Sequence, residues 1–407
     1  MFVAMSAVDV RADPSDAFID SIRERYPTER EIDRVLTEKM RRRGGPGFSG
    51  ISLKTMEQGT AALVRHHIGD DFEISNGRWL QGGASKLQMA FELEWNGPAG
   101  GTRQVTTMVL RMGLPESIVE TSRRREHLAL QAMGGVVPVP ACHWIDADGE
   151  YLPHPALIYE FNAGRTRPAA RPSQQVTGIG INFGPQLRNP VARDFVDHLA
   201  AIHRADPTPL LHGEAFDPAE VGSNASVIRQ VHWWLRVWEE DRGEAHPVIA
   251  VAAQWLIENA PPLDHVSIVH GDFRSGNFLF CESEERITAW LDWELSVLGD
   301  RHQDLTWTMS PYFGHFAEDG KTFLVSGLLT EDEFLHRYSA ASGLIVDPQR
   351  LVYFRIFNTF VTCVHMFGTA YRVALQSKTH QDIVVAWLAM IGPIALANLT
   401  DLLEQHI

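Results

Sequence analysis

Cysteines are scarce in this sequence. Its 407 residues include three of them, Cys142, Cys281 and Cys363, and none forms a C-x-x-C pair. An odd number of widely spaced cysteines disfavours a disulfide framework or a zinc site and fits a reducing cytoplasm. The N-terminus reaches acidic residues before any long apolar run, so we expect no secretory signal.

Long apolar segments are also missing. The most apolar stretch, residues 383–396, is shorter than a membrane span requires and contains Gly392 and Pro393. We therefore expect no membrane partner. We interpret this stretch as a buried C-terminal helix that is kinked or broken at the proline.

Basic residues are fewer than acidic ones, 36 against 51, and the formal net charge is -15. An acidic surface is repelled by a phosphate backbone, so nucleic acid is a poor candidate partner. With 44% hydrophobic and 21% charged residues, the composition is typical of a globular protein. The length suits two packed lobes better than one compact domain.

Three segments can be distinguished by their patterns. Residues 1–72 are predicted to form a charged, helical N-terminal extension packed on the first lobe. Residues 73–162 alternate as strands around one helix and predict a small α+β lobe. Residues 163–407 are predicted to be mainly helical. Within them, residues 165–190 are rich in Pro, Gly, Gln and Asn, and we expect a loop that could close over a substrate as a lid.

A short β-rich island interrupts the helices and contains three polar residues at the ends of apolar runs: Asp272, Asn277 and Asp292. Phosphoryl transfer requires in-line positioning, a cation and a carboxylate that orients the attacking hydroxyl. Asp272 can be that carboxylate, while Asn277 and Asp292 offer oxygen ligands to Mg²⁺. The alternative is an ordinary turn with an Asx cap.

The segment HGDFRSGN, residues 270–277, resembles the H-G-D-x-x-x-x-N loop of the aminoglycoside phosphotransferase and choline kinase superfamily. LDWE, residues 291–294, resembles its metal-binding element. The arginine in the loop and the run LDWELSVLGD resemble the kinase-like domains attached to acyl-CoA dehydrogenases and their free-standing bacterial relatives.

This resemblance implies a bilobal protein-kinase-like fold of the α+β class, with a nucleotide-binding lobe at 73–162 and an acceptor site in 163–407. It also implies ATP or GTP and Mg²⁺ as cofactors. The catalytic candidates are Asp272, Asn277, Asp292 and Arg274, and the metal candidates are Asn277, Asp292 and Glu294.

Further positions match the nucleotide site of the same template. Gly82, Gly83, Ser85 and Lys86 resemble the phosphate-covering turn, although a glycine pair alone also fits a simple hairpin. Arg111 stands where the superfamily usually has a lysine, and Glu126 is its candidate partner. As an alternative, Arg111 could be a surface strand residue. Glu160 and Asn162 fall in the connector that meets the nucleotide base.

Several other residues are expected to support the site or the core. By resemblance, Asp304 anchors the catalytic-loop backbone and His270 orients the loop. His203 is interpreted as a satisfied packing residue. The cluster Trp233, Trp234 and Trp238 has helical spacing and is most simply core.

The acceptor is poorly specified by the sequence. Aromatic and imidazole side chains follow the metal element in a later helix, namely Phe357, Phe360, His365 and Phe367. If they line the acceptor site, an apolar or acyl-bearing hydroxyl compound is favoured over a polycationic aminoglycoside, and the resemblance makes hydroxyacyl thioesters plausible. The alternatives are that these residues are core and that the chain is a nucleotide-binding pseudokinase or regulatory module without turnover.

Overall fold

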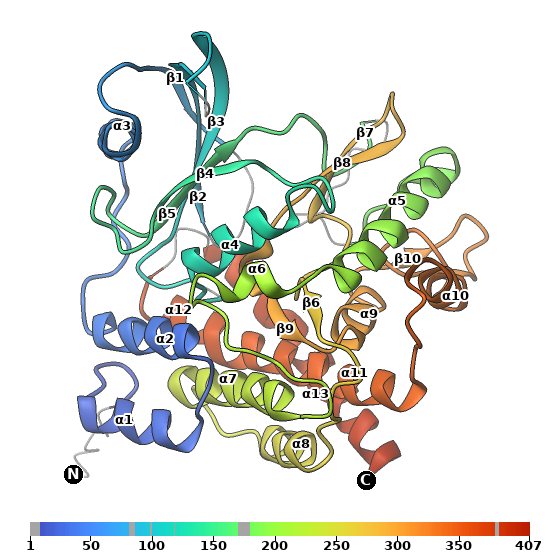
Figure 1. Ribbon diagram of the computed structural model, residues 1–407. Coiled ribbons are helices and arrows are strands. Elements are labelled where there is room, and N and C mark those ends of the chain that lie inside the picture. The colour runs from blue at the N-terminus through green and yellow to red at the C-terminus, as the bar shows by residue number, and fades with distance from the viewer. Residues whose placement is uncertain (1–8, 81–85, 98–99, 118, 170–179, 379–381) are drawn as a thin grey trace.

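The computed structural model describes residues 9–407 except 81–85, 98–99, 118, 170–179 and 379–381. The chain has the expected bilobal α+β fold, with a small β-rich lobe and a larger, mainly helical lobe (Figure 1). The predicted glycines Gly82 and Gly83, and Ser85 beside them, lie outside the described residues.

The small lobe is built on one antiparallel sheet with the strand order β1-β2-β3-β5-β4. Its strands are β1 (Glu73–Trp79), β2 (Leu87–Trp95), β3 (Gln104–Met112), β4 (Cys142–Asp146) and β5 (Ala156–Glu160). Strand β4 was not predicted. Helix α3 (Leu53–Ile68) packs on one face of the sheet, and α4 (Arg123–Met133) lies between the sheet and the helical lobe (Figure 1).

Side-chain alternation in β3 directs its one arginine toward α4. Met108, Leu110 and Met112 are fully buried in the cluster that includes α3. Successive side chains of a strand point to opposite faces, so Val109 and Arg111 face the other way. Arg111 is only 5% exposed, which rules out the surface-strand alternative.

The N-terminal extension is divided between the two lobes, contrary to the prediction that all of it packs on the first. Helices α1 (Asp16–Arg25) and α2 (Arg30–Arg42) lie against α7 of the helical lobe (Figure 1). Apolar side chains of α1 and α2 share a core with the α7 tryptophans. Buried ion pairs from Lys39 and Arg43 to Asp241 fix the contact, and these long-range partners could not be read from the sequence.

Most of the large lobe consists of helices. They are α5 (Gly184–Arg204), α6 (Thr208–Leu211), α7 (Ala225–Asp241), α8 (Pro247–Glu258), α9 (His302–Thr308), α10 (Glu331–Ser342), α11 (Pro348–Val364), η2 (His365–Thr369), α12 (Ala370–Leu375) and α13 (Asp382–His406). The short strands β10 (His315–Phe316) and β11 (Phe323–Leu324) form a hairpin. Three free cysteines are present, as expected from their spacing.

One predicted boundary was wrong. The loop expected over 165–190 ends earlier, because α5 begins at Gly184 and continues through Pro190. Residues 170–179 of the proposed lid lie outside the described part of the chain. Of the two alternatives for the C-terminal helix, kinked or broken at the proline, the break is excluded, because Pro393 lies inside the continuous helix α13.

One helical stretch, Pro348–Leu375, passes a length and hydropathy test for a membrane span within the described residues. However, 72% of its most apolar window is buried inside the protein. This burial is typical of a core helix.

Candidate active site

The loop with the predicted catalytic residues is held between two small antiparallel pairs. Strand β6 (Ser267–Val269) enters it and pairs with β9 (Val297–Gly299). Strand β7 (Phe278–Cys281) leaves it and pairs with β8 (Arg286–Trp290), which is followed by the 3-10 turn η1 (Trp293–Leu295). The apolar runs flanking the polar residues therefore form buried strands, as the sequence indicated.

Asp272 is held in place by three donors. Its Oδ1 accepts hydrogen bonds from Arg274 Nε at 2.8 Å and from Trp307 Nε1 at 2.6 Å. Its Oδ2 accepts one from Asn277 Nδ2 at 2.5 Å. The side chain of Asp272 is 19% exposed, so the carboxylate is partly open to a ligand. Trp307 was not assigned a role from the sequence, although it lies one helical turn after Asp304.

Asp304 anchors the loop backbone, as the resemblance implied. Its Oδ2 accepts from the His270 backbone N–H at 2.7 Å, and its Oδ1 accepts from the Gly271 N–H at 2.9 Å. His203 contacts the same carboxylate at 3.1 Å and Tyr338 Oη at 2.8 Å, which confirms its packing role. Gly271 has φ 83°, and a Cβ there would lie 2.6 Å from the Leu295 carbonyl oxygen, so the turn requires glycine.

We expect Asp304→Ala to destabilise the fold by about 3 kcal/mol or more, because it leaves two backbone N–H groups and the buried Nε2 of His203 without their acceptor. Asp319→Ala is the matched control, since Asp319 also accepts from two backbone N–H groups but on the surface. Its cost should be about 1 kcal/mol or less. Denaturant unfolding measures both, and equal costs would contradict the anchoring role.

His270 is a fully buried orienting group. Its Nδ1 accepts from the Asp272 N–H at 3.2 Å, so its Nε2 donates to the Leu291 carbonyl at 3.0 Å. Burial lowers the pKa of this imidazole, which keeps it neutral. A neutral ring with both nitrogens engaged orients the loop and is poorly placed to accept a substrate proton.

Asn277 and Asp292 present oxygen atoms suited to a hard cation. Asn277 Nδ2 donates to Asp272, so Asn277 Oδ1 is the atom of this amide that can bind a ligand. Asp292 follows β8 with φ 60°, a left-handed conformation that is uncommon outside glycine and typical of functional sites. Its side chain is 36% exposed. Amide and carboxylate oxygens are what Mg²⁺ prefers, so these two residues fit the implied metal.

Arg111 lies among three carboxylates. Its guanidinium pairs with Asp292 Oδ1, with Glu126 Oε1 at 3.3 Å and with Glu294 Oε1 at 3.3 Å. Burial disfavours the charged form, but these carboxylates outweigh it and raise the pKa of Arg111 well above its ordinary value. The predicted partnership between Arg111 and Glu126 is therefore present.

Glu294 is enclosed by cations. Its Oε2 pairs with Lys86 Nζ at 3.3 Å and Arg123 Nη2 at 2.6 Å and accepts from Thr121 Oγ1 at 2.7 Å. Burial alone would raise the pKa of this carboxyl, but Lys86, Arg111 and Arg123 hold it well below its usual range. Both oxygens are thus engaged, and Glu294 can bind a metal only after these pairs open. Arg123 was not assigned a role from the sequence, because its partner Glu294 lies 171 residues later in the chain.

Lys86 is 4% exposed and also donates to Ser117 Oγ at 2.9 Å. Burial lowers the pKa of its ammonium group. The connector residue Glu160 contacts His143 Nε2 at 2.9 Å. Within the described ranges, no three His, Cys, Asp or Glu side chains form a metal cluster, so the metal prediction depends on the Asn277 amide.

The phosphotransferase enzyme family model matches residues 99–351, more than half of the chain. The chain belongs to this family. Known relatives include a probable acyl-CoA dehydrogenase of Arabidopsis thaliana, 29% identical over 60% of this chain and 30% of that protein. Acyl-CoA dehydrogenase family member 11 of Pongo abelii is 30% identical over 68% of this chain and 35% of that protein. The chain thus spans about a third of these relatives' length.

Solved structures support the same fold. A putative aminoglycoside phosphotransferase from Ralstonia eutropha JMP134 matches with a TM-score of 0.58 and 23% identity, over 86% of this chain and 98% of that one. A type I macrolide 2'-phosphotransferase matches with a TM-score of 0.51 and 17% identity, over 84% and 99%. At these identities the likeness shows the fold alone.

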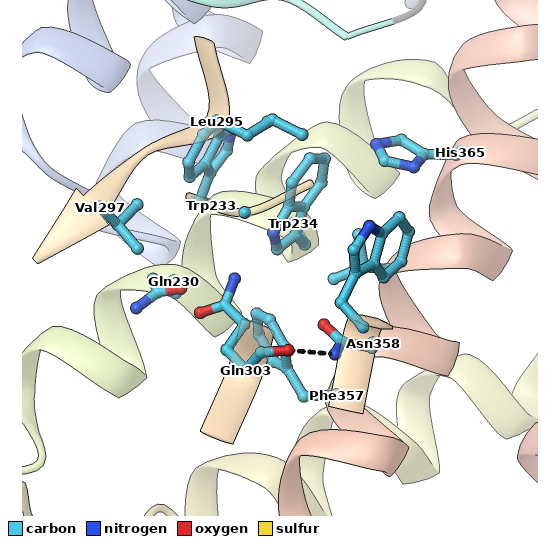
Figure 2. A pocket seen from close by; sticks show the side chains of 12 residues that line it. Gln230, Trp233, Trp234, Leu295, Val297, Gln303, Phe357, Asn358 and His365 are labelled. Carbon is cyan, nitrogen blue, oxygen red and sulfur yellow. Dashed lines mark hydrogen bonds between the residues drawn. The ribbon is translucent and has the colours of Figure 1, made fainter. Parts of the chain in front are cut away.

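Beside the loop with the predicted catalytic residues, the chain has a hollow lined by side chains from α7, α9, α11 and η2 (Figure 2). Phe357 and His365 line it, but Phe357 is only 1% exposed and shares a core cluster with Phe360, and Phe367 packs against the same cluster, so the alternative that these aromatic residues are core stays open. Trp233 and Trp234, expected to be core alone, line it as well. Trp307 links the hollow to Asp272.

His365 is expected to make stability depend on pH. Burial lowers its pKa from 6.5 to about 4, and none of the described residues that line the hollow is charged. Between pH 6.5 and 4 the unfolded chain binds a proton that the folded one rejects, so stability present above pH 6.5 is lost as the pH falls. We expect His365→Gln to reduce that loss by about 3 kcal/mol. The measurement is the free energy of unfolding against pH. Parallel curves for His365→Gln and the unaltered chain would contradict this expectation.

Proposed function

We propose that this chain transfers the γ-phosphoryl group of ATP or GTP, with Mg²⁺, to a hydroxyl of a small molecule. The observation that supports this most strongly is that the bonded pair of Asp272 and Asn277 adjoins the segment that carries Asp292, since the Leu291 N–H donates to the Asn277 carbonyl at 2.8 Å, while Asp292 itself pairs with Arg111. An ordinary Asx turn would not bring together a partly open carboxylate, an available amide oxygen and a buried guanidinium.

The proposed roles follow from these contacts. Asp272, oriented by Arg274 and Trp307, aligns the acceptor hydroxyl and takes its proton. The hydroxyl oxygen bonds to the γ-phosphorus while the bond to the β–γ bridging oxygen breaks, and the nucleoside diphosphate leaves with that electron pair. Mg²⁺, held by Asn277 and Asp292, would neutralise phosphate charge.

Arg111 and Lys86 supply the positive charge on the nucleotide side. Glu126 positions the Arg111 guanidinium, which can grip phosphate oxygens by two hydrogen bonds. Lys86 pairs with Glu294 and so lies in the same ion-pair cluster. Glu160 and Asn162, in the connector, are proposed to border the nucleotide base.

The alternative is a nucleotide-binding module without turnover. It is favoured by the arginine at position 111, because its pair with Asp292 occupies a proposed metal ligand. A mixed panel of hydroxyl compounds with ATP and Mg²⁺ separates the two. The phosphotransferase should release ADP faster with some compounds than without, whereas binding with no ADP release under any condition would favour the module.

The acceptor is proposed to be an apolar or acyl-bearing hydroxyl compound. None of the described residues that line the hollow beside Asp272 is acidic, so a polycationic aminoglycoside would find no counter-charges among them. Rapid turnover of kanamycin-type compounds with none of lipophilic alcohols would contradict this. The three free thiols are compatible with the cytoplasm as the proposed location.

A further inference from the structure

Helix α2 of the N-terminal extension contacts both lobes, although none of the proposed catalytic roles involves it. At the C-terminal end of α2, Arg43 pairs with Glu116 of the small lobe at 2.9 Å and with Asp241 of α7 at 2.6 Å. At its N-terminal end, Glu29 and Glu31 contact the start of α4. These five side chains are all buried. Helix α2 therefore joins the two lobes through buried polar contacts.

The start of α4 depends on a hydroxyl that Glu31 orients. Ser122 is the N-cap of α4, and its Oγ accepts from the backbone N–H groups of Arg124 at 3.1 Å and Arg125 at 3.4 Å. The same hydroxyl donates its hydrogen to Glu31 Oε1. A serine hydroxyl has one hydrogen, so the bond to Glu31 leaves the oxygen lone pairs to the helix N–H groups. Ser122 is 1% exposed, and bulk water has little access to replace that bond.

Arg125 attaches the same turn of α4 to its surroundings. Its guanidinium is fully buried and pairs with Glu29 Oε2. It also donates to the Ser296 carbonyl at 2.7 Å and lies 4.1 Å from the ring centroid of Phe216. A buried guanidinium without a carboxylate is costly, so Glu29 stabilises the side chain in this place. The first turn of α4 is thus fixed both by α2 and by the residue that ends η1.

This first turn also carries Glu126. Glu126 Oε1 pairs with Arg111 Nε at 3.3 Å, and its Oε2 pairs with Arg123. Helix ends fray before helix interiors do, so a first turn with weakened contacts gives Glu126 more freedom to move. The Arg111 guanidinium then loses a fixed partner.

We propose that Glu29 and Glu31 are positioning residues of the phosphate side of the site. By fixing the first turn of α4, they set the place of Glu126 and, through it, of the Arg111 guanidinium. This inference deepens the proposed function and rests on it, since the position of Arg111 matters to a nucleotide only if the chain binds one.

Asp33 offers a matched control on the same helix. Side chains two positions apart on a helix do not face each other, and Asp33 pairs with Arg236 of α7 whereas Glu31 contacts Ser122 of α4. Each of the two carboxylates also pairs with a more exposed arginine of the extension. Asp33→Ala therefore weakens the attachment of α2 to α7 and leaves the contacts of α2 with α4 in place.

Calorimetry with a non-hydrolysable ATP analogue and Mg²⁺ measures nucleotide affinity on the full chain, and thermal unfolding measures Tm. We expect Glu31→Ala and Glu29→Ala each to weaken nucleotide binding about 3- to 10-fold, a moderate loss because α4 stays attached to η1. Asp33→Ala should lower Tm and leave nucleotide affinity unchanged. Glu31→Gln keeps an oxygen that accepts from Ser122, so it should restore most of the affinity.

Ser122→Ala removes the same hydrogen bond from the α4 side. Glu31 keeps its ion pair with Arg34 in this variant, so Ser122→Ala decides the case should Glu31→Ala not fold. Its loss of nucleotide affinity should be similar to that expected of Glu31→Ala.

A double-mutant cycle with Glu126 gives a readout that a merely structural role would not move. Glu126→Gln weakens the link to Arg111. On this background Glu31→Ala should cause little further loss of nucleotide affinity, because both changes act through the same link. The losses in Tm should still accumulate.

The inference is overturned if Glu31→Ala and Ser122→Ala bind nucleotide like the unaltered chain, or if Asp33→Ala loses as much affinity as Glu31→Ala. An undiminished effect of Glu31→Ala in the Glu126→Gln background would also overturn it. In each of these cases the unaltered chain binds nucleotide, and the proposed function is left standing. An unaltered chain that binds no nucleotide would overturn the proposed function and this inference together.

Discussion

Asp272→Ala is expected to lower kcat by about 100-fold or more, the effect of removing a positioned general base. The carboxylate is aligned by Arg274, Trp307 and Asn277, and the proposed role is on the acceptor side. Affinity for Mg²⁺ and nucleotide should therefore stay within a few-fold of the unaltered chain. Steady-state kinetics and calorimetry measure the two effects.

The isosteric Asp272→Asn variant separates chemistry from structure. It keeps the volume of the side chain and one oxygen, so its Tm should be close to normal while kcat stays low. The exposed Asp401→Ala serves as the control with unchanged kinetics. An Asp272→Asn enzyme with near-normal kcat would overturn the assignment of Asp272 as the base.

Asp292→Ala is expected to weaken nucleotide binding in Mg²⁺ by about 100-fold or more, because it removes the proposed anionic ligand of the metal. Without Mg²⁺ we expect Asp292→Ala to leave nucleotide affinity unchanged or to raise it. Asp292 pairs with Arg111, and its removal frees the guanidinium for phosphate and deletes a negative charge near it. Nucleotide affinity measured in a chelator should then be equal to or higher than that of the unaltered chain.

Calorimetry with and without Mg²⁺ tests this pair of expectations, and Asp401→Ala again serves as the control. If Asp292→Ala binds nucleotide equally well in Mg²⁺, Asp292 is not a metal ligand. If it loses affinity by the same factor in chelator, the carboxylate supports the site only structurally.

The parts of the site that local sequence could predict are those set by short-range patterns. Apolar runs around Asp272, Asn277 and Asp292 predicted buried strands, and the strands are present as β6, β7 and β8. Alternation in β3 is also a local property, and it is sufficient to direct Arg111 toward Glu126.

Long-range pairings could not be predicted in the same way. The burial of Arg123 depends on Glu294, which lies 171 residues later. The hollow depends on α7, α9, α11 and η2 meeting, so Trp233 with helical spacing could not be distinguished from an ordinary core residue. Likewise, the ion pairs that attach α2 to α7 involve Lys39 and Asp241, far apart in the chain.

The most direct test of the central claim is a screen of hydroxyl compounds with ATP and Mg²⁺, scored by mass spectrometry for a product heavier by one phosphoryl group. The account predicts such a product from at least one uncharged lipophilic hydroxyl compound, with stoichiometric ADP, and none from Asp272→Asn. ATP consumption that yields only free phosphate, or a product that Asp272→Asn forms equally fast, would contradict it.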